Sequence, residues 1–327
     1  MIKDNMEKQG EFMSSKFVSI ALLLIGFIIV MLIFPALLNE KEVDREICHD
    51  SVLLRGALPD NLNLKEVANL KCTTRKVCLT SKTFGKGDCK DEKGFEKGEY
   101  ETIRVSTGED VNRFVARELA GCWSMMGNGE IQIFTRENSQ KKSCVVCSRI
   151  SFDKELKAEL KNEVDGLGNY MLTHEVPNQN MSYFKYLTGS TPTEFSENLR
   201  KEGLSLSESS FKEIFSKSFS TEQKSIIFME VGSSSFWSDF LKKFSAVGWG
   251  AIGLKTGAVV GALIPIPGTT AIGATAGLAT GVIYGWISGQ KAGDAFVKEK
   301  FGSSEFFVDY NADFLEDLEC TSFENIP

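Results

Sequence analysis

The chain has 327 residues, of which 42% are hydrophobic and 25% charged, so it is long and apolar enough to bury a sizeable core. Its formal net charge of −7 excludes the basic composition typical of nucleic-acid-binding proteins, and we expect no nucleic-acid partner. The acidic excess is confined to residues 304–327, which carry no Lys or Arg.

The first element in chain order is an apolar run that follows a polar tail, residues 1–16. Phe17 to Leu38 contain no charged side chain, and a helix of that length crosses a hydrocarbon core of about 30 Å. The charged sequence after Leu38 lacks the small-residue motif of a cleavable signal peptide. Residues 17–38 therefore predict a retained transmembrane signal anchor, with the bulk of the chain extracytoplasmic.

The cysteines all follow the predicted anchor, and their number is even, as expected for a disulfide-bonded domain in an oxidising compartment. We therefore favour structural disulfides, while reduced thiols remain an alternative. Cys144 and Cys147, with Cys122 upstream, are also candidates for a metal site or a redox pair. In a strand, residues three apart face opposite sides unless a bulge intervenes, which disfavours a shared site. The candidate disulfide residues are Cys48, Cys72, Cys78, Cys89, Cys122, Cys144, Cys147 and Cys320.

Residues 39–243 predict the main part of an α+β extracytoplasmic domain. The apolar spacing from Val111 to Trp123 predicts an amphipathic helix that begins after Ser106 or Thr107 and ends at Gly127-Asn128-Gly129. A charged helix is expected at residues 153–164. Alternating or apolar runs predict strands at 76–80, 100–105, 130–135, 143–152, 181–187 and 223–231.

Two passages in this domain carry a resemblance. GCWSMMGNGEIQIF followed by CVVCSRISFD resembles uncharacterised single-pass membrane proteins of small-genome archaea. The resemblance covers only these passages and implies no activity.

Residues 244–293 contain two glycine ladders with a four-residue step, separated by Pro265-Ile266-Pro267-Gly268. On a helix this step keeps the glycines on one face, where another backbone can approach closely. Each glycine costs roughly 1 kcal/mol against alanine in a water-exposed helix. The segment therefore resembles a glycine-zipper helical hairpin, lying in a bilayer or, alternatively, buried in the soluble domain. Its packing residues are Gly253, Gly257, Gly261, Gly273, Gly277, Gly281, Gly285 and Gly289.

The residues that follow the hairpin, 294–327, are expected to complete the domain. Residues 304–310 predict a strand, and another is predicted before the hairpin at 223–231. We therefore expect the hairpin to be inserted between two strands of one sheet, whose adjacent ends return the chain to the same side.

Motifs of enzymes are absent from the sequence. It has two histidines, His49 and His174, and no nucleophile elbow, zincin motif or dinucleotide fingerprint. We expect no cofactor. The leading hypothesis is a membrane-anchored, non-enzymatic protein that organises the envelope or inserts into a membrane through the hairpin, with a lipid bilayer and its own copies as partners. The alternative is an anchored thiol/disulfide or zinc-dependent enzyme that uses Cys144 and Cys147.

Overall fold

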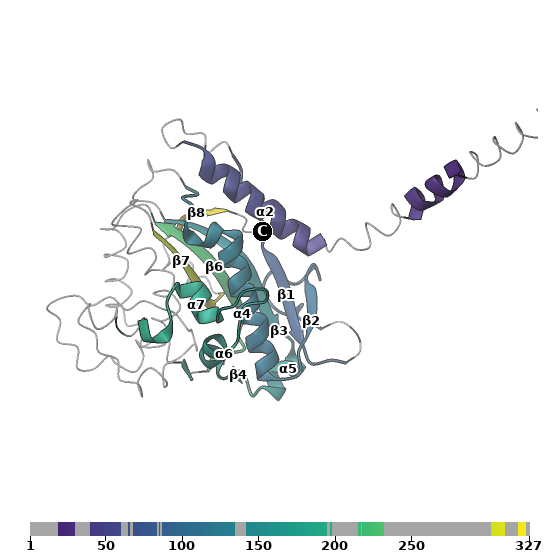
Figure 1. The fold of residues 1–327 in the computed structure, drawn as a ribbon. Coiled ribbons are helices and arrows are strands. Elements are labelled where there is room, and N and C mark those ends of the chain that lie inside the picture. The colour runs from purple at the N-terminus through teal and green to yellow at the C-terminus, as the bar shows by residue number, and fades with distance from the viewer. Residues whose placement is uncertain are drawn as a thin grey trace, which may run out of the picture. The chain divides into compact units, whose positions relative to one another are not determined.

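The computed structural model of the chain divides into two compact units, Met1–Glu46 and Ile47–Pro327 (Figure 1). The structure describes residues 19–29, 40–59, 65, 68–83, 85, 87–134, 142–194, 197, 215–216, 218–231, 302–310 and 320–324.

The expected fold class is wrong in its first element, the transmembrane helix at residues 17–38. Within that range the structure describes a helix over residues 19–29. Among the described residues, no helix has both the length and the apolar character that a membrane crossing requires. The large side chains of the 19–29 helix are exposed, from 49% for Ile29 to 75% for Leu23.

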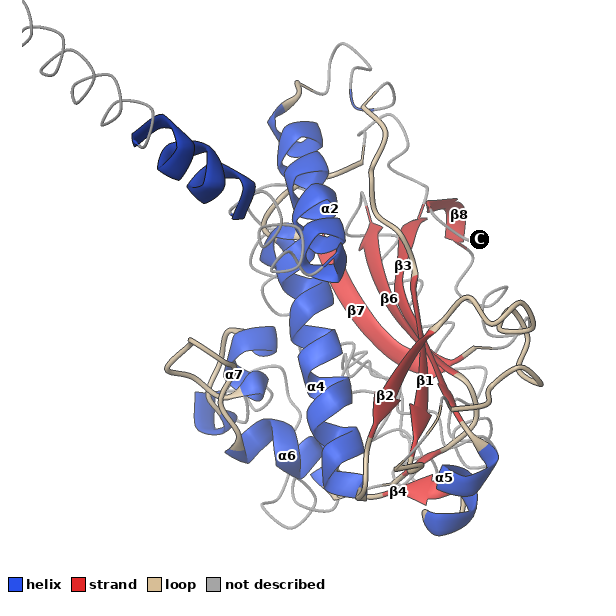
Figure 2. Cartoon of the chain, turned by 90° about the vertical axis from the view of Figure 1, so that its right-hand side faces the viewer, coloured by secondary structure: helices blue, strands red, loops and turns tan. Residues whose placement is uncertain are grey.

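The second unit contains a mixed sheet with the strand order β2-β1-β3-β6-β7, and β8 pairs with β3 off this path (Figure 2). β3 runs parallel to β1 and β8 and antiparallel to β6. One edge of β3 pairs with two strands. The first residues of β3 pair with β8, and its last residues pair with β1. The strands are β1 (Arg75–Thr80), β2 (Glu101–Arg104), β3 (Lys142–Phe152), β6 (Lys224–Val231), β7 (Gly302–Asp309) and β8 (Cys320–Glu324).

Helix α4 (Gly108–Met125) connects β2 to β3 and packs its apolar side on the sheet (Figure 2). Thr107 and Asp110 form a capping box at its start. The predicted apolar face is confirmed, because Val111, Val115, Leu119 and Trp123 are all buried in the main core. The Trp123 ring lies 6.1 Å from that of Phe228 on β6. This contact joins the helix to the centre of the sheet.

Other elements pack against this layer of helix and sheet. Helix α2 contributes Cys48 and Val52 to the main core, and α6 and α7 pack beside α4 (Figure 2). β4 and β5 form a separate two-stranded sheet. The bounds are α2 (Glu40–Ala57), η2 (Gly127–Gly129), α5 (Lys154–Glu159), β4 (Glu163–Val164), α6 (Leu167–Thr173), α7 (Tyr183–Thr188) and β5 (Phe219–Ser220).

Two of the predicted elements differ in the structure. The strand predicted at 181–187 is wrong: Ser182 caps helix α7, whose Tyr183, Phe184 and Leu187 are buried at helical spacing. The helix predicted at 153–164 ends at Glu159, because Lys161 and Asn162 adopt positive φ angles of 54° and 63°.

Candidate functional site at the junction of strands β6 and β7

The strands predicted on either side of the glycine ladders are confirmed as β6 and β7, and they are antiparallel neighbours. Their register runs without a shift from Lys224↔Asp309 to Val231↔Gly302. Paired residues of antiparallel strands lie about 5 Å apart. The chain therefore leaves β6 and enters β7 at adjacent points, which we call the junction. The expected hairpin, with the ladder residues from Gly253 to Gly289, lies outside the described residues.

Both strands at the junction are tied to the loop that follows α4. Glu230, the penultimate residue of β6, accepts hydrogen bonds from the backbone N–H groups of Ile133 at 2.9 Å and Phe134 at 3.2 Å. Its cross-strand partner Ser303 on β7 donates to the carbonyl of Gly129 at 3.4 Å. The departing and the returning strand are thus held by one loop.

These bonds explain why the strand predicted at 130–135 is wrong. Residues 130–134 lie outside any strand. The N–H groups of Ile133 and Phe134, which a strand would offer to a neighbour, are taken by the Glu230 carboxylate. A buried backbone N–H needs one hydrogen-bond acceptor, and a side-chain oxygen serves as well as the carbonyl oxygen of a neighbouring strand.

Glu230 is 3% exposed, and burial raises its pKa to about 7. The two N–H donors and the positive charges of Lys65 and Arg55 oppose that rise in pKa. Desolvation disfavours the charged form, and its effect on the pKa is larger than that of the donors and positive charges. The carboxyl group therefore changes its protonation state near neutral pH.

A second buried carboxyl group lies on β7, two residues from Ser303. Burial, together with the nearby Glu118 of α4, raises the pKa of Glu305 well above its usual value. Glu118 in turn forms an ion pair with Arg75 of β1, which also pairs with Glu101. Burial thus disfavours the charged form of Glu305, whereas the Glu118 carboxylate forms an ion pair with Arg75.

The opposite end of the β6–β7 pair holds two opposite charges. Lys224, 1% exposed, pairs with Asp309 and donates to Ser220 Oγ at 2.8 Å. Burial lowers the pKa of Lys224, and the contact with Asp309 opposes that shift.

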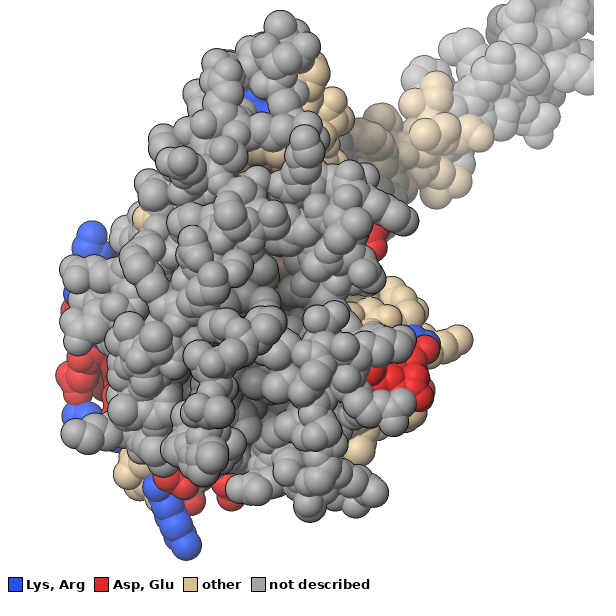
Figure 3. All heavy atoms as spheres, turned by 90° about the vertical axis from the view of Figure 1, so that its left-hand side faces the viewer, with Lys and Arg blue, Asp and Glu red and all other residues tan. Residues whose placement is uncertain are grey.

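The surface charges differ from this buried pair. On the face drawn in Figure 3, charged side chains of the described residues lie at the margins with both signs close together. Ion pairs in such exposed positions contribute little to stability.

The cysteines form four disulfides, which confirms the favoured prediction. The bonds tie α2 to the segment before β1, β1 to the loop after it, α4 to β3, and β3 to β8. The pairs are Cys48–Cys72, Cys78–Cys89, Cys122–Cys147 and Cys144–Cys320.

Cys144 and Cys147 do not act together in this structure. The register with β6 passes from Val146↔Ile227 to Ser148↔Ile226, so Cys147 is the extra residue of a β-bulge. It bonds to Cys122 on the helix side, whereas Cys144 bonds to Cys320 on β8. Metal binding and thiol chemistry require a thiolate, and a disulfide sulfur is not one.

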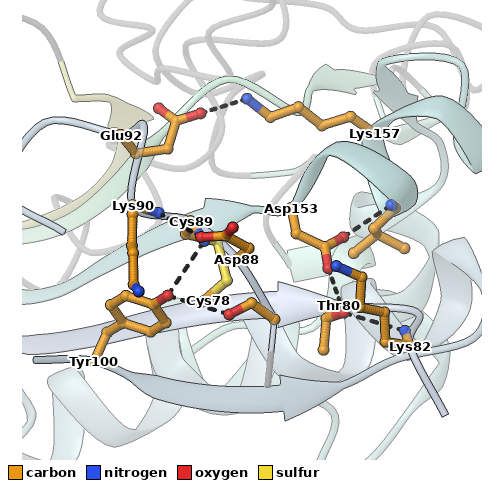
Figure 4. The surroundings of a disulfide bond; sticks show 12 residues. Cys78, Thr80, Lys82, Asp88, Cys89, Lys90, Glu92, Tyr100, Asp153 and Lys157 are labelled. Carbon is orange, nitrogen blue, oxygen red and sulfur yellow. Dashed lines mark hydrogen bonds and ion pairs between the residues drawn. A yellow bond between two sulfur atoms is a disulfide. The ribbon is translucent and has the colours of Figure 1, made fainter. Parts of the chain in front are cut away.

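The Cys78–Cys89 disulfide is buried in a small hydrophobic cluster with Phe95, and polar contacts border it in the β1–β2 connection (Figure 4). Tyr100 donates from its hydroxyl to the Gly87 carbonyl at 3.1 Å and accepts from the Cys89 N–H at 3.4 Å. Lys157 of α5 pairs with Glu92 at 2.6 Å. These contacts fix the β1–β2 connection beside the disulfide.

The two histidines lie at opposite ends of α4. His49 Nδ1 lies 3.2 Å from the carbonyl oxygen of Met125, the last residue of that helix. His174 stacks on Tyr170 with ring centroids 3.8 Å apart and lies 3.9 Å from Glu109 in the first turn. They therefore form no common site. Within the described residues, no group of three His, Cys, Asp or Glu side chains is arranged to hold a metal ion.

No protein-family model, curated protein or solved structure matches this chain.

Proposed function

We propose that this protein is a non-enzymatic, extracytoplasmic protein whose disulfide-braced α+β domain holds residues 232–301 for insertion into a lipid bilayer or association with its own copies. The observation that carries the proposal is the register of β6 and β7, which stay paired as far as Val231↔Gly302. A long segment that leaves and returns at neighbouring points can act without unfolding the sheet that carries it.

The disulfides support the extracytoplasmic placement. Four disulfides in one domain are typical of an oxidising compartment and rare in the cytosol. They also disfavour the thiol or zinc enzyme, because Cys144 and Cys147 serve as separate cross-links between elements.

The glycine ladders support close helix packing by residues 232–301. A ladder such as Gly273, Gly277 and Gly281 lets two helices approach so closely that their backbones touch. Close helix packing of this kind serves association within a bilayer and association between copies equally well. We therefore assign a role in envelope organisation or membrane perturbation to this segment.

Replacing residues 232–301 of the full chain by an Asn-Gly turn tests the proposal. A two-residue turn joins paired antiparallel strand ends directly, so the domain is expected to keep its four disulfides and its thermal midpoint. The natural protein should release dye from lipid vesicles or cross-link to its own copies, and the shortened protein should do neither. If the shortened protein kept full dye release or cross-linking, the activity would lie outside residues 232–301.

A further inference from the structure

The disulfide between Cys144 and Cys320 differs from the other disulfides in its accessibility. Cys320, at the start of β8, is half-buried, whereas every other cysteine of the chain is at most 6% exposed. Thiol–disulfide exchange begins when a thiolate reaches a disulfide sulfur, so access to the sulfur controls the reaction. Exchange with an external thiol is therefore expected to begin at Cys320.

Strand β8 has few other restraints within the described part of the chain. Among the described strands it pairs only with β3, and these short pairings include an irregularity and end at Val145↔Glu324. Directly beyond them, the same edge of β3 has other partners. Thr74 donates to the Val146 carbonyl at 2.9 Å, and β1 pairs with β3 after that point. β8 can therefore leave the sheet without disturbing the pairing of β1.

The start of β8 also lies in line with the junction. Lys142 of β3 is paired on one side with Cys320 and on the other with Val231, the last residue of β6. Val231 is paired in turn with Gly302, the first residue of β7. These residues form one row across the sheet. Cys320 therefore lies at the end of the sheet where the chain leaves β6 and enters β7.

We propose that Cys144–Cys320 is a site of thiol–disulfide exchange, at which an external dithiol opens the bond and releases β8 from β3. One thiolate of the dithiol attacks Sγ of Cys320 and forms a mixed disulfide, while Cys144 Sγ leaves with the electron pair and takes up a proton. The second thiolate then attacks the sulfur of the dithiol in the mixed disulfide and displaces Cys320 as a thiolate, which is protonated. The dithiol is oxidised to a disulfide, and the protein carries two thiols.

Reduction of this bond removes a covalent closure around the junction. Its cysteines are 176 residues apart, the largest separation among the disulfides, and β6, residues 232–301 and β7 all lie between them. In the chain-entropy model a disulfide that closes a longer loop stabilises the fold more. The other disulfides stay closed, so α2, β1 and α4 keep their cross-links while β8 is released.

The proposal is tested on the full chain with graded concentrations of dithiothreitol in the absence of denaturant. Thiols are alkylated under the same conditions and mapped by mass spectrometry. Cys144 and Cys320 should be alkylated at a roughly tenfold lower concentration than the other cysteines. Because Cys144 is 0% exposed in the disulfide-bonded protein, its alkylation reports the release of β8. Earlier or simultaneous reduction of another pair would overturn the proposal, and so would alkylation of Cys320 with Cys144 still protected.

Variants distinguish the release of β8 from a general loss of stability. Cys144→Ala/Cys320→Ala removes the bond permanently, and the amide hydrogens of β8 should then exchange roughly tenfold faster than in the natural protein. Cys78→Ala/Cys89→Ala removes the disulfide between β1 and the loop after it, and should leave exchange in β8 unchanged. Equal exchange in β8 of all three proteins would contradict the assignment. These measurements do not require residues 232–301 to act on a membrane.

Discussion

The two ends of the β6–β7 pair each bury an ionisable side chain, and they stabilise it in different ways. At one end the buried Lys224 meets the opposite charge of Asp309. At the other, the buried Glu230 meets backbone N–H groups, and its pKa rises to about 7. The ion pair compensates the buried charge at the first end, whereas at the second end the cost of burial outweighs the N–H donors and the charges of Lys65 and Arg55, so Glu230 titrates close to neutrality. Residues 232–301 follow β6 at this second end.

The largest expected effect lies at the charge-paired end. Asp309→Ala leaves the Lys224 ammonium buried without its counter-charge, which should lower the free energy of unfolding by about 3–5 kcal/mol. Urea denaturation at pH 7 measures the loss. The double variant Lys224→Met/Asp309→Leu removes both charges and should recover most of it. A small decrease in the free energy of unfolding for Asp309→Ala alone would show that the Lys224–Asp309 pair does not stabilise this end of the strands.

The next effect concerns pH at the Glu230 end. The folded-state pKa of Glu230 is raised above its ordinary value of 4.5 to about 7, so the folded state binds the proton more tightly than the unfolded state. This stabilisation is complete below pH 4.5 and is lost as the pH rises to 7, a change of about 3 kcal/mol.

Glu230→Gln provides the control, because Gln does not titrate. Between pH 5 and pH 8 the free energy of unfolding of the natural protein should fall by roughly 2–3 kcal/mol more than that of the variant. The buried Glu305 contributes to the slope in both proteins and cancels from the difference. Parallel curves would mean that Glu230 is not the titrating group.

The smallest effect is expected at Ser303. Its bond to the Gly129 carbonyl is long, at 3.4 Å, and neutral. Ser303→Ala should therefore lower the free energy of unfolding by about 1 kcal/mol or less, without changing its pH dependence. A loss as large as that of Asp309→Ala would place the main restraint of the junction on β7.

The sequence predicted the elements whose side-chain period is regular. Val111, Val115 and Leu119 repeat at helical spacing and lie on the buried face of α4. The apolar run of β6 was also recognisable, and alternation with Ile226 and Phe228 places Glu230 on the same inner face. That inward-facing carboxylate is the sequence signal of the junction.

Other features depend on contacts between distant residues and could not be predicted locally. Residues 130–134 have a strand-like sequence, but their donors bind a side chain that lies 96 and 97 positions further along the chain. The even number of cysteines favoured disulfides, yet the bulge at Cys147 that separates it from Cys144 follows from the register with β6. Apolar composition alone predicts the anchor at 17–38, whereas no helix among the described residues has the length and apolar character of a membrane span.

The central claim is that residues 232–301 are the active part and that the braced domain is their support. The most direct measurement compares Gly277→Leu with Ala279→Leu in the full chain, by dye release from lipid vesicles and by cross-linking between copies. Position 277 belongs to the glycine ladder and position 279 faces away from it on a helix. We predict that Gly277→Leu abolishes both signals, that Ala279→Leu retains them, and that both variants keep the disulfides and the thermal midpoint. Equal activity of the two variants would contradict the account.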